Sequence, residues 1–202
     1  MKPIDVAIIG SGAGGGTVAK SLIPLVKACK RVVLFEKGPR FQDSDFTGQE
    51  LPMAEKLYAS GGGVMVADQT ITLAFAECYG GSTSVYTGTS LLPPQRIIEQ
   101  WGLDGIEHSN LCQRAERFKL ENYVHFMPEE CLNDNNKLFQ KGCEQLGWKA
   151  EQFPVNVKGC QGSSLCNLGC PNGAKQGTAK VQLPMAEKAG VEVVTQAKVL
   201  SI

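Results

Sequence analysis

The chain has 202 residues, of which 43% are hydrophobic and 20% are charged, a balance that suits a packed core and argues against wholesale disorder. Twenty basic and 20 acidic side chains give a formal net charge of +0, which argues against nucleic-acid binding through bulk electrostatics. The apolar runs are shorter than the roughly 20 residues of a membrane-spanning helix, and the N-terminus has no signal-peptide pattern. We therefore expect no transmembrane segment, no nucleic-acid partner and a cytoplasmic location by default, with periplasmic export alongside a partner subunit as the alternative.

The first 40 residues predict a βαβ unit. Residues 4–9 form an apolar run that is typical of a buried parallel strand. A glycine-rich stretch, residues 10–16, leads into a predicted helix over residues 17–29, which Pro24 should kink or restart. Residues 31–36 predict a second buried strand, and the crossover between the two strands should be right-handed.

The glycine-rich stretch matches the G-x-G-x-x-G fingerprint of dinucleotide-binding folds, at the strand-to-helix junction that this fingerprint requires. Gly10 allows a tight turn, Gly12 lets the backbone approach a pyrophosphate, and Gly15 allows close packing of helix and strand. Glu36 ends the second strand and can accept hydrogen bonds from a ribose. FAD and NAD share this fingerprint, so it does not distinguish the two cofactors. The structural alternative is a glycine-rich turn that binds no ligand, with Glu36 as a solvated strand end.

The middle of the chain is less regular. Residues 70–76 predict a strand, and the sequence Gly80-Gly81-Ser82-Thr83-Ser84 that follows it has the small, donor-rich backbone that suits a diphosphate or a flavin edge. Such a stretch is also common as a simple turn. Three helices are expected next. The first covers residues 96–100, and the second covers residues 109–118 with Ser109 as its cap. Asn135 or Asn136 would cap the third, which would direct Leu138, Phe139 and Leu146 inward.

Three of the eight cysteines lie within residues 160–170. Cys160, Cys166 and Cys170 follow the bacterial ferredoxin run C-x2-C-x2-C-x3-C-P, with Ser163 in place of the second cysteine. Three thiolates match a [3Fe-4S] cluster better than a four-iron cube, whereas a zinc site would need a fourth ligand. Three free thiols, or one disulfide and one free thiol, are the alternatives. Beyond this loop we expect a helix over residues 178–189 and strands over residues 191–194 and 198–202.

Together these motifs resemble the glucose–methanol–choline (GMC) oxidoreductases, a family of FAD-dependent alcohol and sugar dehydrogenases and oxidases. The resemblance rests on the stretches VAIIGSGAGGGTVAK (6–20), VVLFEKGP (32–39), ECYGGSTS (77–84) and GCQGSSLCNLGCPNGAKQGT (159–178), together with residues 191–202. It covers only the N-terminal third or so of such an enzyme. The cysteine loop looks most like that of the sugar and polyol dehydrogenases, although long-chain alcohol oxidases have a similar loop.

The resemblance implies a set of FAD-binding residues. The pyrophosphate would lie on the fingerprint, which comprises Gly10, Ser11, Gly12, Ala13, Gly14 and Gly15. The adenosine ribose would bind Glu36, and the adenine would meet the backbone of Val199. Gly81 and Ser82 would lie near the pyrophosphate or the flavin. The metal ligands would be Cys160, Cys166 and Cys170.

We therefore expect an α/β fold with a Rossmann-like FAD-binding βαβ core and an additional, mostly helical and loop segment, which together form an incomplete domain. Residues 1–40 would form the βαβ unit and residues 41–95 an FAD-contacting loop region. Residues 96–158 would be a helical insertion or the start of a substrate domain. Residues 159–202 would be the cysteine-rich loop, a helix and strands that return to the FAD domain.

The implied reaction is oxidation of the CH–OH group of an alcohol, sugar or polyol by hydride transfer to the flavin. Electrons could then leave through the cluster to an acceptor subunit. The family's catalytic His lies near the C-terminus of longer members and matches neither His108 nor His125, so no catalytic residue is assigned. The alternatives are an inactive truncated or split-gene piece, which would need its missing C-terminal portion, and an NAD(P)-dependent Rossmann enzyme.

Overall fold

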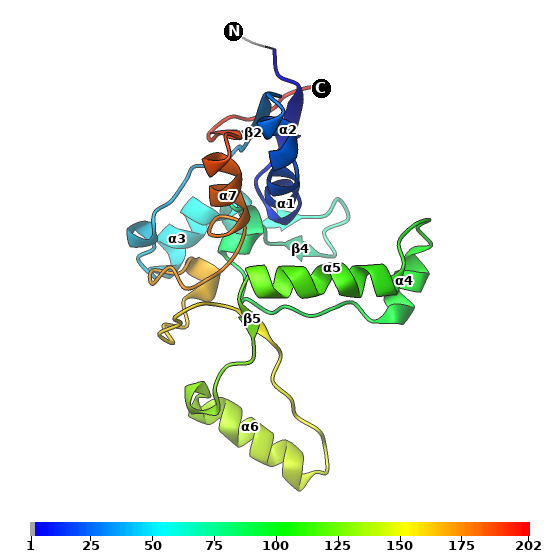
Figure 1. Cartoon of the computed structure of the whole chain (residues 1–202). Coiled ribbons are helices and arrows are strands. Elements are labelled where there is room, and N and C mark those ends of the chain that lie inside the picture. Colours follow the sequence, from blue (N-terminus) through cyan, green and yellow to red (C-terminus); the bar gives the residue numbers. More distant parts are fainter. Residues whose placement is uncertain (1–2) are drawn as a thin grey trace. The chain divides into compact units, whose positions relative to one another are not determined.

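The computed structural model describes residues 3–202, which form two compact units (Figure 1). The first unit combines the chain up to Thr87 with the chain from Lys158 onwards, and the second comprises Gly88–Val157. No helix among the described residues is both long and apolar enough to cross a membrane.

The predicted βαβ unit is confirmed. Strands β1 (Val6–Ile9) and β2 (Val32–Phe35) pair in parallel, with Val6 opposite Val32. Two helices connect them, α1 (Ala13–Ser21) and α2 (Ile23–Lys27). Pro24 lies in the first turn of α2, where its missing N–H group is not needed, so the predicted helix restarts there.

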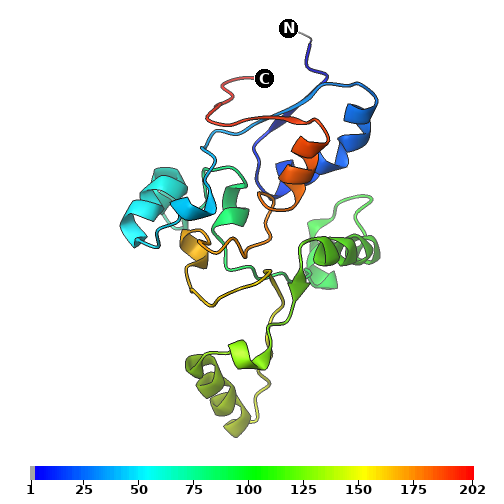
Figure 2. The same ribbon diagram turned by 60° about the vertical axis from the view of Figure 1, so that its left-hand side comes forward.

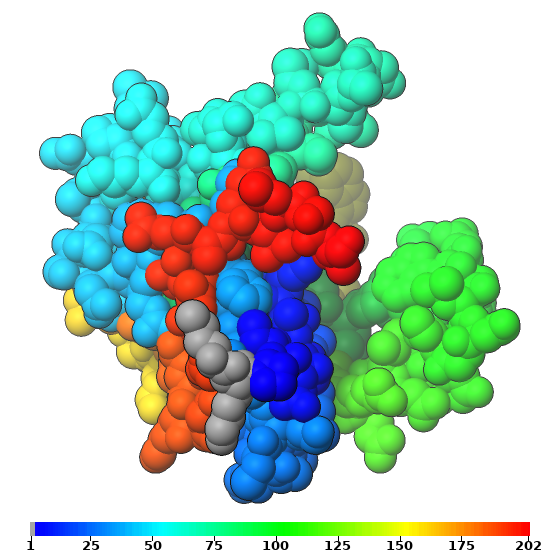
Figure 3. All heavy atoms as spheres, turned by 90° about the horizontal axis from the view of Figure 1, so that it is seen from above, coloured from blue at the N-terminus to red at the C-terminus, as the bar shows by residue number. Residues whose placement is uncertain are grey.

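A third parallel strand comes from the far end of the sequence. β7 (Glu192–Val194) pairs with β2, which gives the strand order β1-β2-β7. The space-filling view shows this C-terminal part, in red, against the blue N-terminal segments of the same unit (Figure 3). Helix α7 (Gln182–Lys188) precedes β7 and packs beside α1 (Figure 2). The parallel sheet with its helical connections confirms the predicted α/β class.

The main core lies between this sheet and its helices. Ile8, Val32 and Leu34 on the strands meet Ala19 of α1 and Leu183 of α7. Because strand side chains alternate between faces, the neighbouring residues point the other way. That opposite face is only partly covered: Val33 is buried, whereas Ile9 is 53% and Val194 is 42% exposed.

The rest of the first unit surrounds a smaller core of Met53, Leu57, Cys78 and Val85. It contains helix α3 (Glu50–Leu57) and a short antiparallel pair, β3 (Val64–Met65) with β4 (Thr72–Leu73). The strand predicted over residues 70–76 is therefore only two residues long.

The second unit contains the three predicted helices and one pair of short strands. The helices are α4 (Gln95–Trp101), α5 (His108–Glu121) and α6 (Asp134–Gln145). The strands β5 (Val124–His125) and β6 (Val155–Asn156) are antiparallel.

Three details of this unit differ from the sequence-based expectation. Glu107, not Ser109, occupies the N-cap position of α5, without a side-chain hydrogen bond. Asn133, rather than Asn135 or Asn136, caps α6 by accepting a hydrogen bond from the Asn136 N–H group at 2.9 Å. The inward orientation predicted on α6 is wrong, since Leu138 and Phe139 are each 69% exposed and Leu146 is 65% exposed. Helical spacing identifies an apolar side of a helix but does not show whether another element covers it.

The C-terminal segment also differs. Helix α7 begins at Gln182 rather than at residue 178, and residues 198–202 form no strand. A strand exists only where a neighbouring strand accepts its hydrogen bonds, and in the described part of the chain residues 198–202 pair with none. Val199 therefore lies, partly buried, in an irregular segment.

Candidate functional site

The turn between β1 and α1 has a geometry that only glycine satisfies at two positions. Gly10 has a φ of +88°, in the left-handed region. A Cβ atom on Gly15 would lie 1.8 Å from the Gly10 carbonyl oxygen, so a side chain there would collide with the turn. The first and last glycines of the fingerprint thus have the structural roles that the motif predicts for them.

The N-terminus of α1 has the features of an anion-binding site. Its N-cap is Gly12, no side chain caps it, and its first turn contains no acidic residue. The first N–H groups of a helix have no partner within the helix, and the helix dipole makes this end positive. Backbone donors and a positive potential therefore face the position where a pyrophosphate would bind, so this site fits the FAD diphosphate.

Glu36 faces the fingerprint. Its Oε2 atom accepts hydrogen bonds from the N–H group of Ser11 at 2.8 Å and from the Ser11 hydroxyl at 2.5 Å. Its Oε1 atom accepts one from the Gly38 N–H group at 2.8 Å. Glu36 is only 6% exposed, so it is not a solvated strand end. A carboxylate has about four acceptor positions, which leaves capacity for a ribose hydroxyl.

The Gly80–Ser84 stretch lies directly against the fingerprint, although about 70 residues separate the two in sequence. The Gly80 N–H group donates to the Ser11 hydroxyl at 2.9 Å. Gly81 has a φ of +53°, and a Cβ atom on it would lie 2.7 Å from the Gly12 Cα atom. The two glycines thus allow two backbones to touch, and the structure brings Gly81 beside Gly12 of the fingerprint. The Ser82 hydroxyl accepts a hydrogen bond from the Ala76 N–H group at 3.1 Å.

The last residues of the chain approach the same region. The Ala197 N–H group donates to the Glu36 carbonyl at 2.9 Å, and the Gln196 N–H group donates to the Gly38 carbonyl at 3.1 Å. Val199 follows two residues later in irregular backbone. The expected strand is absent, but the segment that carries Val199 does run past the end of β2.

The cysteine loop does not form a ready metal site. Cys160 is exposed, Cys166 and Cys170 are partly buried, and all three are free thiols. The Cys170 Sγ atom accepts a hydrogen bond from the Ala174 N–H group at 3.3 Å. Within residues 3–202, no group of three or more His, Cys, Asp or Glu side chains is arranged to hold a metal ion. As this structure places them, the three thiols therefore do not converge as the ligands of an iron–sulfur cluster would.

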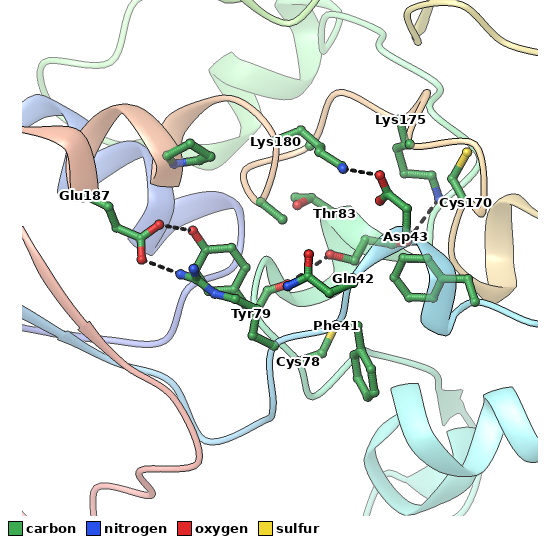
Figure 4. Close-up of a pocket in the computed structure, with 17 residues that line it drawn as sticks. Phe41, Gln42, Asp43, Cys78, Tyr79, Thr83, Cys170, Lys175, Lys180 and Glu187 are labelled. Carbon is green, nitrogen blue, oxygen red and sulfur yellow. Dashed lines mark hydrogen bonds and ion pairs between the residues drawn. The ribbon is translucent and has the colours of Figure 1, made fainter.

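A cavity of about 260 Å³ adjoins this loop, and sequence reasoning missed it (Figure 4). Two ion pairs line it: Lys180 lies 2.6 Å from Asp43, and Arg40 pairs with Glu187. The hydroxyl of Tyr79 donates to Glu187 at 2.7 Å, and burial raises the pKa of this tyrosine. The fingerprint glycines do not line the cavity, so it is distinct from the candidate anion site at the N-terminus of α1.

Lys175 is a buried residue of this region that the sequence analysis did not predict. It lines the cavity, is only 5% exposed, and its Nζ atom donates to the carbonyls of Ser84, at 3.3 Å, and Cys166. Burial lowers the pKa of Lys175 to about 8. Lysine is usually a surface residue, so nothing in its local sequence predicts this position.

The comparisons with known proteins agree with this geometry. The sequence profile of a family described as GMC oxidoreductase matches residues 54–202. The long-chain-alcohol oxidase FAO4B of Arabidopsis thaliana is 31% identical over 205 residues, which cover 96% of this chain and 26% of that protein. An uncharacterized GMC-type oxidoreductase of Mycobacterium tuberculosis is 31% identical over 201 residues, which cover 96% of this chain and 32% of that protein.

The fold has a solved counterpart. The crystal structure of pyridoxine 4-oxidase from Mesorbium loti superimposes with a TM-score of 0.59 at 14% sequence identity, and the match covers 96% of this chain and 42% of that one. At that identity the likeness concerns the fold alone. The chain spans about a quarter to a third of the length of the two curated relatives, 26% and 32%.

Proposed function

The chain belongs to the GMC oxidoreductase family, and on this premise we propose that it is the FAD-binding portion of an enzyme that oxidises the CH–OH group of an alcohol. One observation carries the proposal: the fingerprint turn, Glu36 and the Gly80–Ser84 stretch meet around the buried Ser11. Three segments that are distant in sequence thus form one site with anion-binding donors at one end and a carboxylate at the other.

Each part of this site has a role in binding FAD. The N-terminus of α1 would hold the pyrophosphate, and Glu36 would accept a hydrogen bond from the ribose. Gly81 and Ser82 would lie along the pyrophosphate or the flavin, and the backbone near Val199 would meet the adenine. When bound, FAD supplies the hydride acceptor for the oxidation. The protein's contribution is to bind and orient it, and we assign no catalytic base within this chain.

The relatives favour an alcohol as the substrate. The Arabidopsis relative is named as a long-chain-alcohol oxidase, and its match extends over 96% of this chain. We therefore propose a long-chain alcohol rather than a sugar or polyol, with molecular oxygen rather than an acceptor subunit as the electron acceptor. Family membership also favours FAD over NAD(P) as the cofactor.

A titration of the purified chain with FAD tests the proposal. We expect saturable 1:1 binding, detected as quenching of the flavin fluorescence. The Glu36→Gln variant should bind FAD more weakly, because glutamine keeps the shape of the side chain but removes its charge. NAD and NADP serve as competitors. Saturable binding of NAD, with no binding of FAD, would overturn the proposal. A long-chain alcohol can then be compared with a sugar in the full-length enzyme.

The [3Fe-4S] cluster at Cys160, Cys166 and Cys170 is a separate hypothesis that rests on the cysteine spacing alone. Iron and acid-labile sulfide analysis of the protein purified without oxygen decides it. Stoichiometric iron and sulfide, lost in Cys166→Ser, would establish the cluster. Iron-free protein that still binds FAD would remove the cluster and leave the FAD site unaffected.

A further inference from the structure

The Lys175 ammonium is buried among backbone carbonyls. Its Nζ atom donates to the carbonyls of Ser84 and Cys166, and it lies 5.4 Å from the centre of the Tyr86 ring. Among the described residues, no carboxylate forms an ion pair with it. A buried lysine without an acidic partner is rare, because its ammonium loses its hydration and must be compensated by other groups.

The two carbonyls belong to two different segments of the first unit. Ser84 ends the short 3-10 helix η3 (Gly81–Ser84), whereas Cys166 begins η5 (Cys166–Leu168) in the cysteine loop. The Tyr58 hydroxyl forms a second link in the same place, since it donates to the Asn167 carbonyl at 2.7 Å and lies 3.5 Å from the Val85 carbonyl. Two side chains thus hold the cysteine loop against η3 and the residue after it.

The other side of η3 touches the nucleotide fingerprint. The Gly80 N–H group is bound to Ser11, and Gly81 packs against the backbone of Gly12. A continuous series of contacts therefore runs from the cysteine loop, through Lys175 and η3, to the proposed FAD site. Movement at the loop end of this series would displace the backbone expected to contact the cofactor.

We propose that Lys175 is a positioning residue, an internal cation that fixes the cysteine loop against η3 and thereby orients Gly81 and Ser82 at the FAD site. This inference rests on the proposed function. An ammonium group suits the task because it is compact and has three donors, which can bind carbonyls of separate segments at once. In this structure the lysine side chain thus holds the cysteine loop through the Cys166 carbonyl.

Lys175→Met tests the inference, because methionine has a similar length but neither charge nor donors. Lys180→Met is the matched control: Lys180 lines the same cavity, but its side chain is 40% exposed and pairs with Asp43. We expect at least about tenfold weaker FAD binding in Lys175→Met and a change in the visible circular dichroism of the bound flavin. Binding by Lys180→Met should stay within about twofold of the wild type.

A second readout does not depend on FAD. In the apoprotein, loss of Lys175 should release the cysteine loop, so thermolysin should cleave near Leu165 and Leu168 faster in Lys175→Met than in Lys180→Met. Tyr58→Phe removes the second link and should act in the same direction. If Lys175→Met does not fold, Lys175→Gln, which keeps a neutral donor, replaces it in both assays.

The outcomes separate the two proposals. A wild-type chain that binds no FAD contradicts the proposed function, and the proteolysis still decides whether Lys175 fixes the loop. Wild-type FAD affinity, an unchanged flavin dichroism spectrum and unchanged cleavage in the Lys175 variants would overturn the inference about Lys175. Faster cleavage with unchanged FAD binding would also overturn it, because release of the cysteine loop would then have no effect on the FAD site.

Discussion

Ser11 shows how a single small residue organises the candidate site. It is completely buried, and its hydroxyl donates to Glu36 and accepts from the Gly80 N–H group. Its carbonyl accepts a hydrogen bond from the Thr178 hydroxyl at 3.1 Å. Four distant segments therefore meet at one variable position of the fingerprint, which the motif itself leaves unspecified.

The glycines of the fingerprint are not equivalent, and substitution by alanine should distinguish them. Gly15→Ala should destabilise the fold by about 1–3 kcal/mol, because the new methyl group collides with the Gly10 carbonyl. Gly14→Ala should stabilise it by about 0.5–1 kcal/mol, since nothing lies within 4 Å and alanine favours the helix. Urea unfolding of both variants measures the difference. Equal unfolding free energies would show that the turn is looser than its geometry implies.

At the scale of elements, neighbouring residues of β1 point to opposite faces of the sheet, one covered and one open to solvent. Ile8 lies in the main core and is 7% exposed, whereas its neighbour Ile9 is 53% exposed. A parallel sheet usually has both faces covered, so the open side is the less typical feature of this unit.

Two neighbouring substitutions test this asymmetry. Ile8→Ala should lower the free energy of unfolding by about 2–5 kcal/mol, because it leaves a cavity between β1 and its helices. Ile9→Ala should change it by less than about 1 kcal/mol, because the side chain is half exposed. Denaturant midpoints, recorded at several protein concentrations, measure both. A large, concentration-dependent effect of Ile9→Ala would show that a second copy covers the open face.

An ion pair between Arg31, just before β2, and Glu192 of the edge strand β7 should make stability depend on pH. Arg31 donates to both oxygens of Glu192, at 2.8 and 2.9 Å, and this interaction lowers the pKa of the Glu192 carboxyl below its usual value. The stabilisation is therefore present above the pKa of the unfolded chain and disappears as the pH falls through the lower pKa of the folded state.

Glu192→Gln should accordingly be less stable than the wild type at pH 7, and the difference should shrink as the pH falls below the usual range of a glutamate pKa. The difference at pH 7 should be small, because the Glu192 side chain is 49% exposed and that of Arg31 27%, so solvent and salt screen the pair. Urea unfolding at pH 7, 5 and 3 measures it, with Arg31→Gln and the double variant completing a mutant cycle. A difference that stays constant over this range would contradict the role of the ionised pair.

At the scale of the whole molecule, the second unit is an insertion whose two ends meet. The Asn156 N–H group donates to the Gly88 carbonyl at 3.0 Å, and the Ser90 N–H group donates to the Pro154 carbonyl at 2.9 Å. The chain thus leaves the first unit at Thr87 and returns at Lys158 from adjacent positions.

Replacement of residues 88–157 by a linker of about four residues, a common loop length, should leave the first unit folded. Because the ends are already hydrogen-bonded, such a linker requires no stretching of the backbone. We expect a cooperative thermal transition, measured by circular dichroism at 222 nm, close to that of the whole chain. A shortened chain without a cooperative transition would show that the first unit depends on the second.

Local patterns were sufficient to predict the elements whose residues interact with close neighbours. The apolar runs at residues 4–9 and 31–36 predicted β1 and β2, and the structure has both. The helix expected over residues 17–29 restarts near Pro24, which gives α1 and α2, and α1 begins earlier than expected, at Ala13. Backbone hydrogen bonding, helix periodicity and the steric demands of glycine and proline act over a few residues, so the order of residues expresses them directly. The same reasoning identified Gly10, Gly12 and Gly15 as one turn.

Contacts between distant segments required the tertiary structure. Only the fold shows that Gly81 touches Gly12, that Ser11 binds Glu36, and that Lys175 is buried between η3 and the cysteine loop. It also shows that α6 exposes its apolar side and that residues 198–202 lack a partner strand. Burial and pairing depend on which segments meet in space, and a periodic pattern carries no information about that partner.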